Sequence, residues 1–577
     1  MQVDKVKNEF SARNVQELIY DISKFNRAKG SDEFHSAVEL IRNYLPDSEL
    51  LTFSSQKTYN SWEVPEDFNL KGGYLRYSDG GPYLISSLSR QPAGVLFSSD
   101  ATEGTEELKV FDAGKGEKPE DYEGYQSEAA VIAHGHPTLV YYQAVKKRGA
   151  RCLLLCHMRS ENFDIGRTRE QMPEAVNYSS LPSIKSEGEK AFGFSLSWQQ
   201  MKELRQKLEE KDEVTLEAKI SKSPGTGELE IIKTVTGENK EDTRPLLLTA
   251  HLCHPRPGAN DNASGAALLA ELMRVFDKFS LSRKVVAIWV PEMYGPAALL
   301  EEGKWQEFSA VINLDMVAQD QDLTGSTLNI FSTPWSVPSF ISELAAYHLE
   351  DKSFRMRQQQ YAGGSDHFIF SNPSVGVPGI SITQLPDKFY HTDQDTPDKT
   401  STATINWVGK SVIDIIDDLI DMSSESASAA AARIVKNYLE PDKKEESELV
   451  KRYRAFLARE KLEQLNELAE LGPELKWLEE EAAGFSLPNY RDNFRSVTGP
   501  IANHWMGAKT RVEYVKNRRK YENWGNFIFE LINFLELGFD KTEAIELARM
   551  EFGLSEEVVS KAEDLLEKIQ KEELINL

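Results

Sequence analysis

The chain has 577 residues, enough for three or four domains, and its hydrophobic and charged fractions of 40% and 28% are typical of globular proteins. A net charge of −25 argues against nucleic acid and anionic membranes as partners, because both attract cationic surfaces. No apolar run approaches the ~18 residues of a membrane span, and three cysteines without a metal-finger spacing indicate a reducing compartment. We therefore expect a cytoplasmic protein with neither kind of partner.

The first 48 residues predict two helices that open a larger domain. A helical stretch over 14–25 precedes a second one over 34–45, which ends before Pro46. From residue 49 to 227 the pattern changes to short β-like runs between turn residues. This part also contains a strand–helix–strand unit, expected over 129–133, 138–148 and 152–156. We therefore expect an inserted, β-rich domain over residues 49–227.

Strands and helices alternate between residues 228 and 425. Strands are expected at 246–250, 285–290, 310–314 and 379–382, and helices at 266–279, 339–349 and 407–422. This alternation is typical of an α/β fold with a mostly parallel, mixed sheet and helices on both faces. Residues 423–435 are small and predict a linker or the start of a solvated helix. The remainder, 436–577, predicts a C-terminal helical domain that covers the site or mediates self-association.

Residues with metal-binding chemistry stand at the carboxyl ends of the expected strands, where open α/β sheets place their ligand sites. They are His251, His254, Asp261, Glu292, Asp315 and His391. Imidazoles and carboxylates suit zinc, and one carboxylate can bridge two ions. A further carboxylate must accept the proton of the attacking water. The set therefore predicts a hydrolytic metal centre.

Each of these residues also has a structural interpretation when it is taken alone. Asp261 could be the N-cap of a helix, and Asp315 could close a turn. A histidine at a strand end is often an ordinary polar residue. The order of the residues and their shared position favour the metal site. For Asp366 and His367, a turn that packs beneath the site is as reasonable as a role in substrate binding.

The motifs resemble those of the zinc exopeptidases of the bacterial leucyl aminopeptidase and glutamate carboxypeptidase type. The likeness covers roughly residues 10–46 and 228–422, and rests on NDNASG at 260–265, NLD at 313–315, SDH at 365–367 and YHT at 390–392. A narrower likeness, to aminopeptidase-like proteins with a CHP…NDNxSG motif, adds Cys253-His254-Pro255. The strand–helix–strand unit resembles the protease-associated domain that is inserted in such enzymes.

The resemblance implies a metallopeptidase with zinc as cofactor, as one or two ions, and with cobalt or manganese as alternatives. It implies Glu292 as the catalytic base. The metal ligands would be His254, Asp261, Asp315, His391 and His251, and the substrate-binding residues Asp366, His367 and Tyr390.

Two positions depart from the family pattern. The family has two adjacent glutamates, the first a base and the second a ligand, whereas this chain has Glu292 followed by Met293. One metal would lose a ligand, so the site could hold one tight ion. Cys253 stands where the family has an aspartate that orients the first histidine. We expect His254 to be the metal ligand. His251 would then contact a metal ligand and not the metal itself, or would face the substrate.

Three functions are compatible with the sequence. The leading hypothesis is an aminopeptidase that removes N-terminal residues from peptides through metal-activated water. The second is an amide or acyl hydrolase that acts on a small molecule. The third is a non-catalytic relative, which the missing glutamate favours. We expect a homo-oligomer with a peptide substrate.

Overall fold

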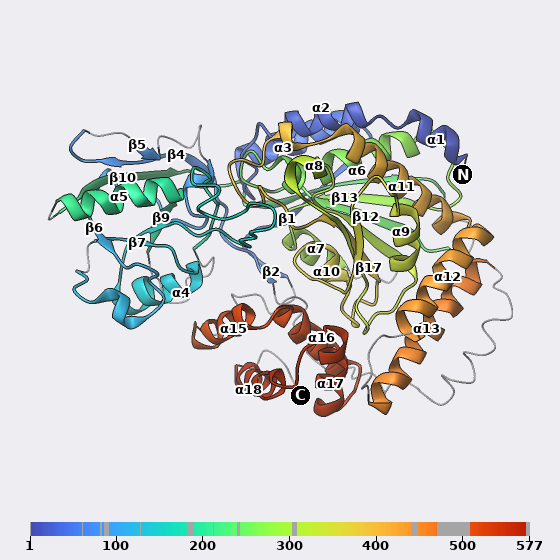
Figure 1. Cartoon of the computed structure of the whole chain (residues 1–577). Helices are drawn as coiled ribbons and strands as arrows, with labels where there is room; N and C mark the ends of the chain where they lie inside the picture. Colours follow the sequence, from blue (N-terminus) through green and yellow to red (C-terminus); the bar gives the residue numbers. More distant parts are fainter. Residues whose placement is uncertain are drawn as a thin grey trace.

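The computed structural model describes residues 2–59, 62–80, 83–85, 92–126, 129–181, 190–211, 213–238, 243–302, 308–439, 447–469 and 508–572. Within this part of the chain, no helix combines the length and the apolar character needed to cross a bilayer. Figure 1 shows three parts: an α/β domain, a smaller β-rich domain beside it, and C-terminal helices packed below both.

The α/β domain is built on a mixed sheet with the strand order β1-β11-β13-β12-β14-β17-β15-β16. Its centre is parallel and consists of β13 (Val285–Val290), β12 (Leu246–His251), β14 (Ala310–Leu314) and β17 (Gly379–Gln384). The remaining strands are β1 (Glu49–Ser54), β11 (Glu228–Thr236), β15 (Leu328–Phe331) and β16 (Met356–Gln359). The expected fold class is confirmed, and the sequence did not predict the strands at the two edges.

Helices cover both faces of this sheet (Figure 1). On one face lie α1 (Val3–Glu9), α2 (Ala12–Ile22), α3 (Asp32–Tyr44), α6 (Gly265–Phe276), α9 (Ile341–Leu349) and α11 (Thr402–Ile420). On the other lie the short helices α7 (Tyr294–Leu299) and α10 (His367–Phe370). Strand β12 shows why both faces are apolar, because Leu246 and Leu248 pack into one core and Leu247 into the other.

The smaller domain interrupts a β-hairpin of the α/β sheet. Strands β1 and β11 are antiparallel neighbours, and Ser54 pairs with Glu228 at the point where the chain leaves and returns. The insertion therefore begins after Ser54. The expected start at residue 49 is too early by one strand, because β1 pairs with the main sheet and not with the inserted one.

The inserted domain has its own seven-stranded sheet, in the order β5-β4-β10-β6-β7-β8-β9. These strands are β4 (Leu70–Tyr77), β5 (Tyr83–Ile85), β6 (Glu106–Asp112), β7 (Ala130–Ala133), β8 (Cys152–Leu155), β9 (Phe192–Ser195) and β10 (Thr215–Lys222). Helices α4 (Pro137–Tyr141) and α5 (Trp198–Glu210) belong to it. Strands β6 to β9 are parallel, so the loops after β7 and β8 leave the sheet at the same edge.

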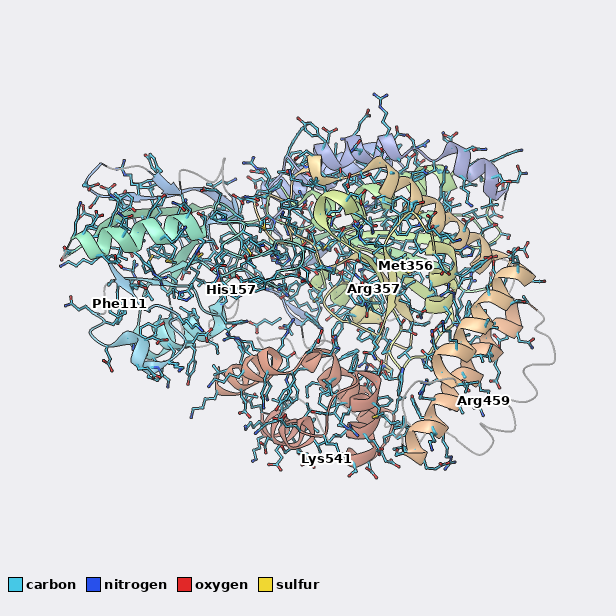
Figure 2. All side chains as sticks on the ribbon, in the orientation of Figure 1. Phe111, His157, Met356, Arg357, Arg459 and Lys541 are labelled. Carbon is cyan, nitrogen blue, oxygen red and sulfur yellow. The ribbon has the colours of Figure 1, made fainter. Side chains whose placement is uncertain are left out.

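The C-terminal part is helical. Helix α12 (Ser424–Leu439) includes most of the expected linker, and α13 (Glu448–Leu468) packs beside it. Beyond residues 470–507, which lie outside the described part, come α15 (Ala508–Lys520), α16 (Trp524–Glu536), α17 (Lys541–Glu551) and α18 (Val558–Lys571). Figure 2 marks the three parts by Phe111 in the inserted domain, Met356 in the α/β domain and Lys541 in the C-terminal helices.

Candidate metal centre

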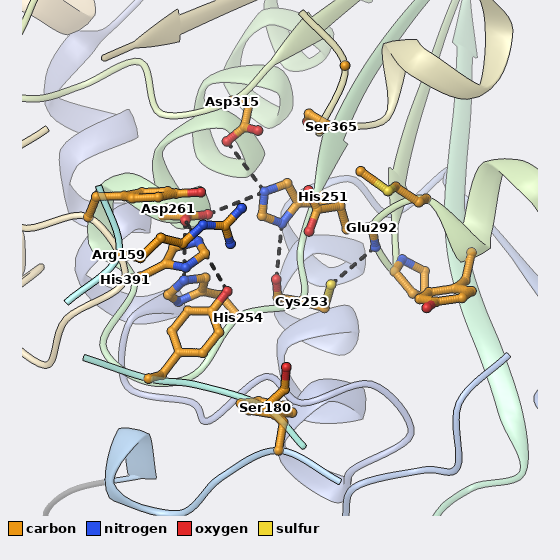
Figure 3. A pocket seen from close by; sticks show the side chains of 18 of the residues that line it. Arg159, Ser180, His251, Cys253, His254, Asp261, Glu292, Asp315, Ser365 and His391 are labelled. Atoms are coloured by element: carbon orange, nitrogen blue, oxygen red, sulfur yellow. Dashed lines mark hydrogen bonds and ion pairs between the residues drawn. The ribbon is translucent and has the colours of Figure 1, made fainter. Parts of the chain in front are cut away.

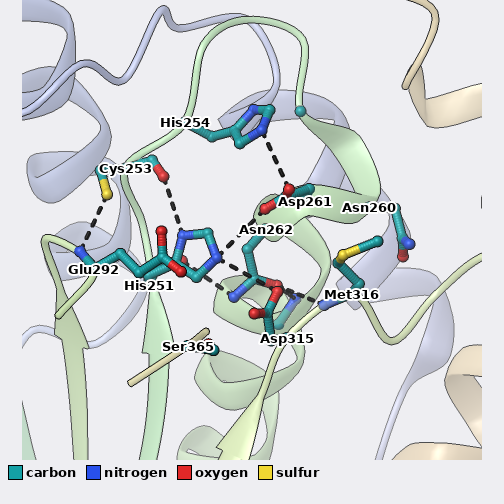
Figure 4. A network of polar contacts seen from close by, with 12 residues as sticks. His251, Cys253, His254, Asn260, Asp261, Asn262, Glu292, Asp315, Met316 and Ser365 are labelled. Carbon is teal, nitrogen blue, oxygen red and sulfur yellow. Dashed lines mark hydrogen bonds and ion pairs between the residues drawn. The ribbon is translucent and has the colours of Figure 1, made fainter. Parts of the chain in front are cut away.

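The candidate site lies at the carboxyl edge of the parallel strands. His251 is the last residue of β12, Asp315 directly follows β14, and Glu292 follows β13 by two residues. Asp261 comes from the loop before α6, and His391 from the loop after β17. Figure 4 shows the side chains of His251, Asp261 and Asp315 turned toward one another.

Asp261 belongs to two groups of donor atoms. In the first group, Nε2 of His251 lies 3.4 Å from Oδ1 of Asp261 and 3.4 Å from Oδ1 of Asp315. In the second group, Oδ2 of Asp261 lies 3.3 Å from Nε2 of His254 and 3.1 Å from Nε2 of His391. Each oxygen of the Asp261 carboxylate thus faces a different group, which is the arrangement of a bridging ligand.

The histidines are oriented by backbone carbonyls. Nδ1 of His251 lies 3.0 Å from the oxygen of Cys253, and Nδ1 of His254 lies 2.7 Å from the oxygen of Pro255. With Nδ1–H donating to a carbonyl, Nε2 carries the lone pair that a metal needs. The carbonyl of Cys253 therefore orients His251, which is the role expected of the aspartate side chain at this position in the family.

The donor set fits a divalent metal. Nε2 of His254 and Oδ1 of Asp315 are buried and have no hydrogen-bond partner among the described residues. Buried polar atoms in proteins normally have a hydrogen-bond partner. Buried atoms that lack one and that face a shared carboxylate therefore indicate that a ligand binds between them. The six donor atoms of the two groups, from three imidazoles and two carboxylates, match the chemistry of zinc.

The loop that carries Asp261 is shaped by Gly258 and by the side chain of Asn262. Gly258 has φ +51°, and a Cβ there would lie 2.2 Å from Nδ1 of His254. The side chain of Asn262 joins three loops: it accepts from the amides of Gly265 and Met316 at 2.9 and 3.0 Å, and donates to the carbonyl of Leu314 at 3.0 Å. The NDNASG segment thus holds the ends of β12 and β14 in register.

A second layer of acidic residues fixes the backbone of Asp261. The amides of Asn260 and Asp261 each donate to Oδ2 of Asp395, at 3.1 and 3.0 Å. Burial, together with the neighbouring Asp387, raises the pKa of Asp395 well above its ordinary value. The sequence motif included Asp395 but did not show that it holds this loop.

The charges of the site are strongly coupled. Burial alone would raise the pKa of Asp261, but the imidazoles of His254, His251 and His391 bring it well below its ordinary value. Burial lowers the pKa of His391 to about 3, which keeps this ring neutral at physiological pH. A neutral imidazole is the form that binds a metal.

Glu292 has no direct partner for its carboxylate among the described residues. Its backbone amide donates to Sγ of Cys253 at 3.1 Å, which fixes the turn after β13. Burial, with the nearby carboxylates of Asp315 and Asp366, raises the pKa of Glu292 to about 8 despite the opposing effect of His251. A bound cation would favour the ionised form and oppose this rise.

Asp366 lies behind Glu292 and does not line the cavity. Its Oδ1 accepts from the amide of Met293 at 2.7 Å, and burial raises its pKa to about 7. His367 does line the cavity, but its Nε2 donates to the carbonyl of Ala362 at 2.8 Å. The substrate roles expected for both residues stay predictions, and the observed contacts of Asp366 are with the Glu292 turn.

The donor atoms open into a cavity of about 720 Å³. Its walls come from all three parts of the chain, and Figure 3 shows the side chains that surround the metal-binding residues. The inserted domain contributes Tyr178, whose hydroxyl lies 3.1 Å from Nε2 of His391 and whose ring stacks on it at 4.2 Å. Tyr390 contacts the same imidazole, with ring centroids 3.7 Å apart.

The C-terminal helices close the cavity on one side. Tyr514 and Asn526, from α15 and α16, line it. Oδ1 of Asn526 accepts from the amide of Gly363 at 3.0 Å, and Arg519 reaches Glu117 of the inserted domain with contacts of 2.7 and 2.8 Å. Covering the site is one of the two roles expected for this domain, but no motif in the helices indicated which residues would line the cavity.

Comparison with known proteins agrees with this geometry. Residues 230–416 match the sequence model of Peptidase family M28. These residues form a peptidase family M28 domain. No curated protein matches the chain.

Solved structures show the same fold around the M28 domain. A candidate peptidase from Clostridium acetobutylicum has 17% identity and a TM-score of 0.53, with 83% of this chain and 97% of that one covered. A zinc aminopeptidase from Bacillus subtilis has 17% identity and a TM-score of 0.54, with 73% of this chain and 97% of that one covered.

Proposed function

We propose that the protein is a zinc-dependent aminopeptidase that removes N-terminal residues from peptides, with cobalt or manganese as alternative ions. One observation carries the proposal. A single buried carboxylate, Asp261, joins two sets of three donor atoms at the strand ends of a peptidase family M28 domain. This arrangement supports two ions and argues against a non-catalytic relative.

Each ion would have three protein ligands. His251, Asp261 and Asp315 would hold one, and His254, Asp261 and His391 the other. In the second set, His254 supplies the donor that is lost because Met293 stands at the place of the family's second glutamate. The two histidines therefore need not compete for one role, and two bound ions are a better interpretation than one.

Glu292 is the best candidate for the proton carrier. Divalent ions at such a site polarise the scissile carbonyl and lower the pKa of a water. The Glu292 carboxylate would accept the proton of the attacking water and pass it to the departing amine. Its half-buried position and the lack of a hydrogen bond to its carboxylate from any described residue support this role, because a base must be able to gain and lose a proton without breaking a fixed contact.

The shape of the cavity favours an exopeptidase. Walls from the inserted domain and from α15 and α16 surround the donor atoms, so a chain end enters more readily than the middle of a long polypeptide. A small amide would also fit, and substrate assays separate the two functions.

The test combines metal analysis with substrate assays. We expect about two equivalents of zinc per chain after reconstitution, and release of amine from aminoacyl-nitroanilides that chelation abolishes. N-acetylated forms of the same substrates serve as the control and should be cleaved at least tenfold more slowly. A protein that binds less than a few tenths of an equivalent of zinc would contradict the proposal. Cleavage of the acetylated forms alone would favour the amide hydrolase.

A further inference from the structure

Arg159 is a cation on the cavity wall. It follows β8 of the inserted domain, and Figure 3 shows its guanidinium beside Asp261 and His391. It interacts electrostatically with Glu292 and Asp261, but it forms no ion pair or hydrogen bond through its side chain with any described residue. Its one ring neighbour is Tyr390, at 5.7 Å from the centroid.

Neighbouring arginines that are buried have their donors occupied. Arg167 donates to the carbonyls of Lys388, Tyr390 and Arg159, each at 2.7 Å. Arg27 likewise donates to backbone carbonyls, including that of Gly258 at 2.9 Å. These two residues organise loops. Arg159 keeps accessible surface and lines the cavity, so its five donors remain available there.

The part of Arg159 that faces the cavity is suited to a planar anion. A guanidinium presents donors in a rigid fork that matches both oxygens of a carboxylate. A second guanidinium without a hydrogen-bond or ion-pair partner among the described residues, that of Arg518 in α15, lines the same cavity. In a chain of net charge −25, Arg159 and Arg518 bring positive charge to the lining of this cavity. The same charge would repel a substrate that is cationic at this position.

We propose that Arg159 is a specificity residue that binds a carboxylate of the substrate, so that short acidic peptides are preferred. The inference deepens the proposed function and rests on it. Two sources of this carboxylate are chemically equivalent at the guanidinium: an acidic side chain, or the free C-terminus of a very short peptide. A volume of about 720 Å³ lies within the range of small-molecule sites and fits both.

The first experiment compares substrates that differ only in a carboxylate. One pair is the nitroanilide of glutamate and that of glutamine. The other pair is alanyl-alanine and its C-terminal amide. We expect the zinc-loaded protein to prefer the acidic member of one pair by roughly 10- to 100-fold in kcat/KM, the value of a charge-assisted hydrogen bond. The pair that shows the preference identifies the source of the carboxylate.

Variants then assign the preference to Arg159. Arg159→Met should remove the preference between the acidic and the neutral member of the pair, whereas Arg159→Lys should retain part of it. Arg151→Met is the matched control, because Arg151 lies in the same domain, pairs with Glu106 at 3.0 Å and does not line the cavity. Zinc content should be the same in all three variants and the parent.

Binding provides a measurement that does not need turnover. Calorimetry with the hydroxamates of glutamate and glutamine, and with succinic acid monohydroxamate and its amide, should show the same acid preference in the parent and its loss in Arg159→Met. If no peptide is cleaved but this preference is found, the proposed function fails and the role of Arg159 stands. Equal binding of acid and amide in both pairs, or a preference that survives Arg159→Met, overturns the inference.

Discussion

The floor and the walls of the cavity are built in different ways. The floor carries the metal-binding residues, which come from the ends of neighbouring strands of one sheet and from the segments after them. The walls are formed by Arg159 and Tyr178 of the inserted domain and by α15 and α16, which are distant in the sequence. Chemistry common to a family can therefore stay in the floor, while substrate choice changes with the walls.

The difference between floor and walls predicts different effects for variants in each. Changes in the floor should alter metal content or turnover with little dependence on the substrate. Changes in the walls should alter substrate preference or the attachment of the C-terminal helices, and should leave the metal in place. A floor variant that changed only specificity, or a wall variant that lost zinc, would break the distinction.

The largest effect is expected for Asp261→Asn. This substitution removes the charge of the only residue common to both donor groups, so both ions lose a ligand. We expect less than about 0.3 equivalents of zinc and a loss of activity of roughly 10³-fold or more. Elemental analysis beside turnover measures both. Asp277→Asn, at the exposed C-terminal end of α6, is the matched control and should change neither quantity.

Glu292→Gln should separate binding from chemistry. The amide has the shape of the carboxylate but cannot accept a proton, so we expect turnover to fall by about 10²-fold or more with zinc retained. Zinc content and kcat are measured on the same preparation. If the variant arrives with less zinc than the parent, Glu292 is a ligand and the assignment of the base is wrong.

His254→Ala tests whether this residue replaces the missing glutamate. The variant should keep the ion held by His251, Asp261 and Asp315 and lose most of the other, with affinity for the second equivalent reduced at least 10- to 100-fold. The double variant His254→Ala/Met293→Glu should recover part of that second equivalent, because it restores a carboxylate beside Glu292.

Either of two results would contradict this assignment of the second set of ligands. One is that His251→Ala empties the site while His254→Ala does not. The other is that the double variant binds no more zinc than His254→Ala. His348→Ala is the control, since this histidine pairs with Asp418 at 2.6 Å and does not line the cavity.

The difference between floor and walls also explains which parts of the site could be predicted from the sequence. The central strands were predicted almost to the residue, since each is a short apolar run, and the residues after them then had to meet at one edge. That both His251 and His254 face Asp261 could not be predicted. It depends on how the loop turns after β12, where carbonyls of Leu252 and Gly258 accept from the buried side chain of Arg27, at 2.8 and 2.9 Å.

The residues that form the walls could not be predicted, for a physical reason. The position of Tyr178 near His391 depends on the docking of two domains, through the bond from its amide to the carbonyl of His391 at 2.8 Å. No local pattern encodes such a contact. The edge strand β1 was likewise assigned to the insertion, because a half-exposed strand of six residues resembles the β-rich segment that follows it. The proposed cytoplasmic location and homo-oligomer stay predictions.

The smallest effect concerns the attachment of the C-terminal helices to the α/β domain. Two buried carboxyls, Glu530 of α16 and Glu551 of α17, meet the loop after β15. Glu530 accepts from the amide and the hydroxyl of Ser336, at 2.8 and 2.6 Å, and Glu551 accepts from the amide of Trp335 at 3.2 Å. Burial, with the neighbouring Glu530, raises the pKa of Glu551 well above its ordinary value of 4.5.

A carboxyl whose pKa is raised in the folded protein contributes stability that is present below its unfolded pKa and is lost as the pH rises through its folded pKa. We therefore expect the Tm of the parent to fall between pH 5 and pH 9 through Glu551. Glu551→Gln keeps a donor toward Glu530 and cannot ionise. The Tm of this variant should therefore exceed that of the parent by a margin that grows with pH to a few degrees, which corresponds to about 1 kcal/mol in the free energy of unfolding. Thermal unfolding at pH 5, 7 and 9 measures this, with the exposed Glu556→Gln as the control for lost charge. A constant difference across this range would show that Glu551 is ionised in the fold. Because neither Glu530 nor Glu551 lines the cavity, zinc content should be unchanged at every pH where the parent retains it.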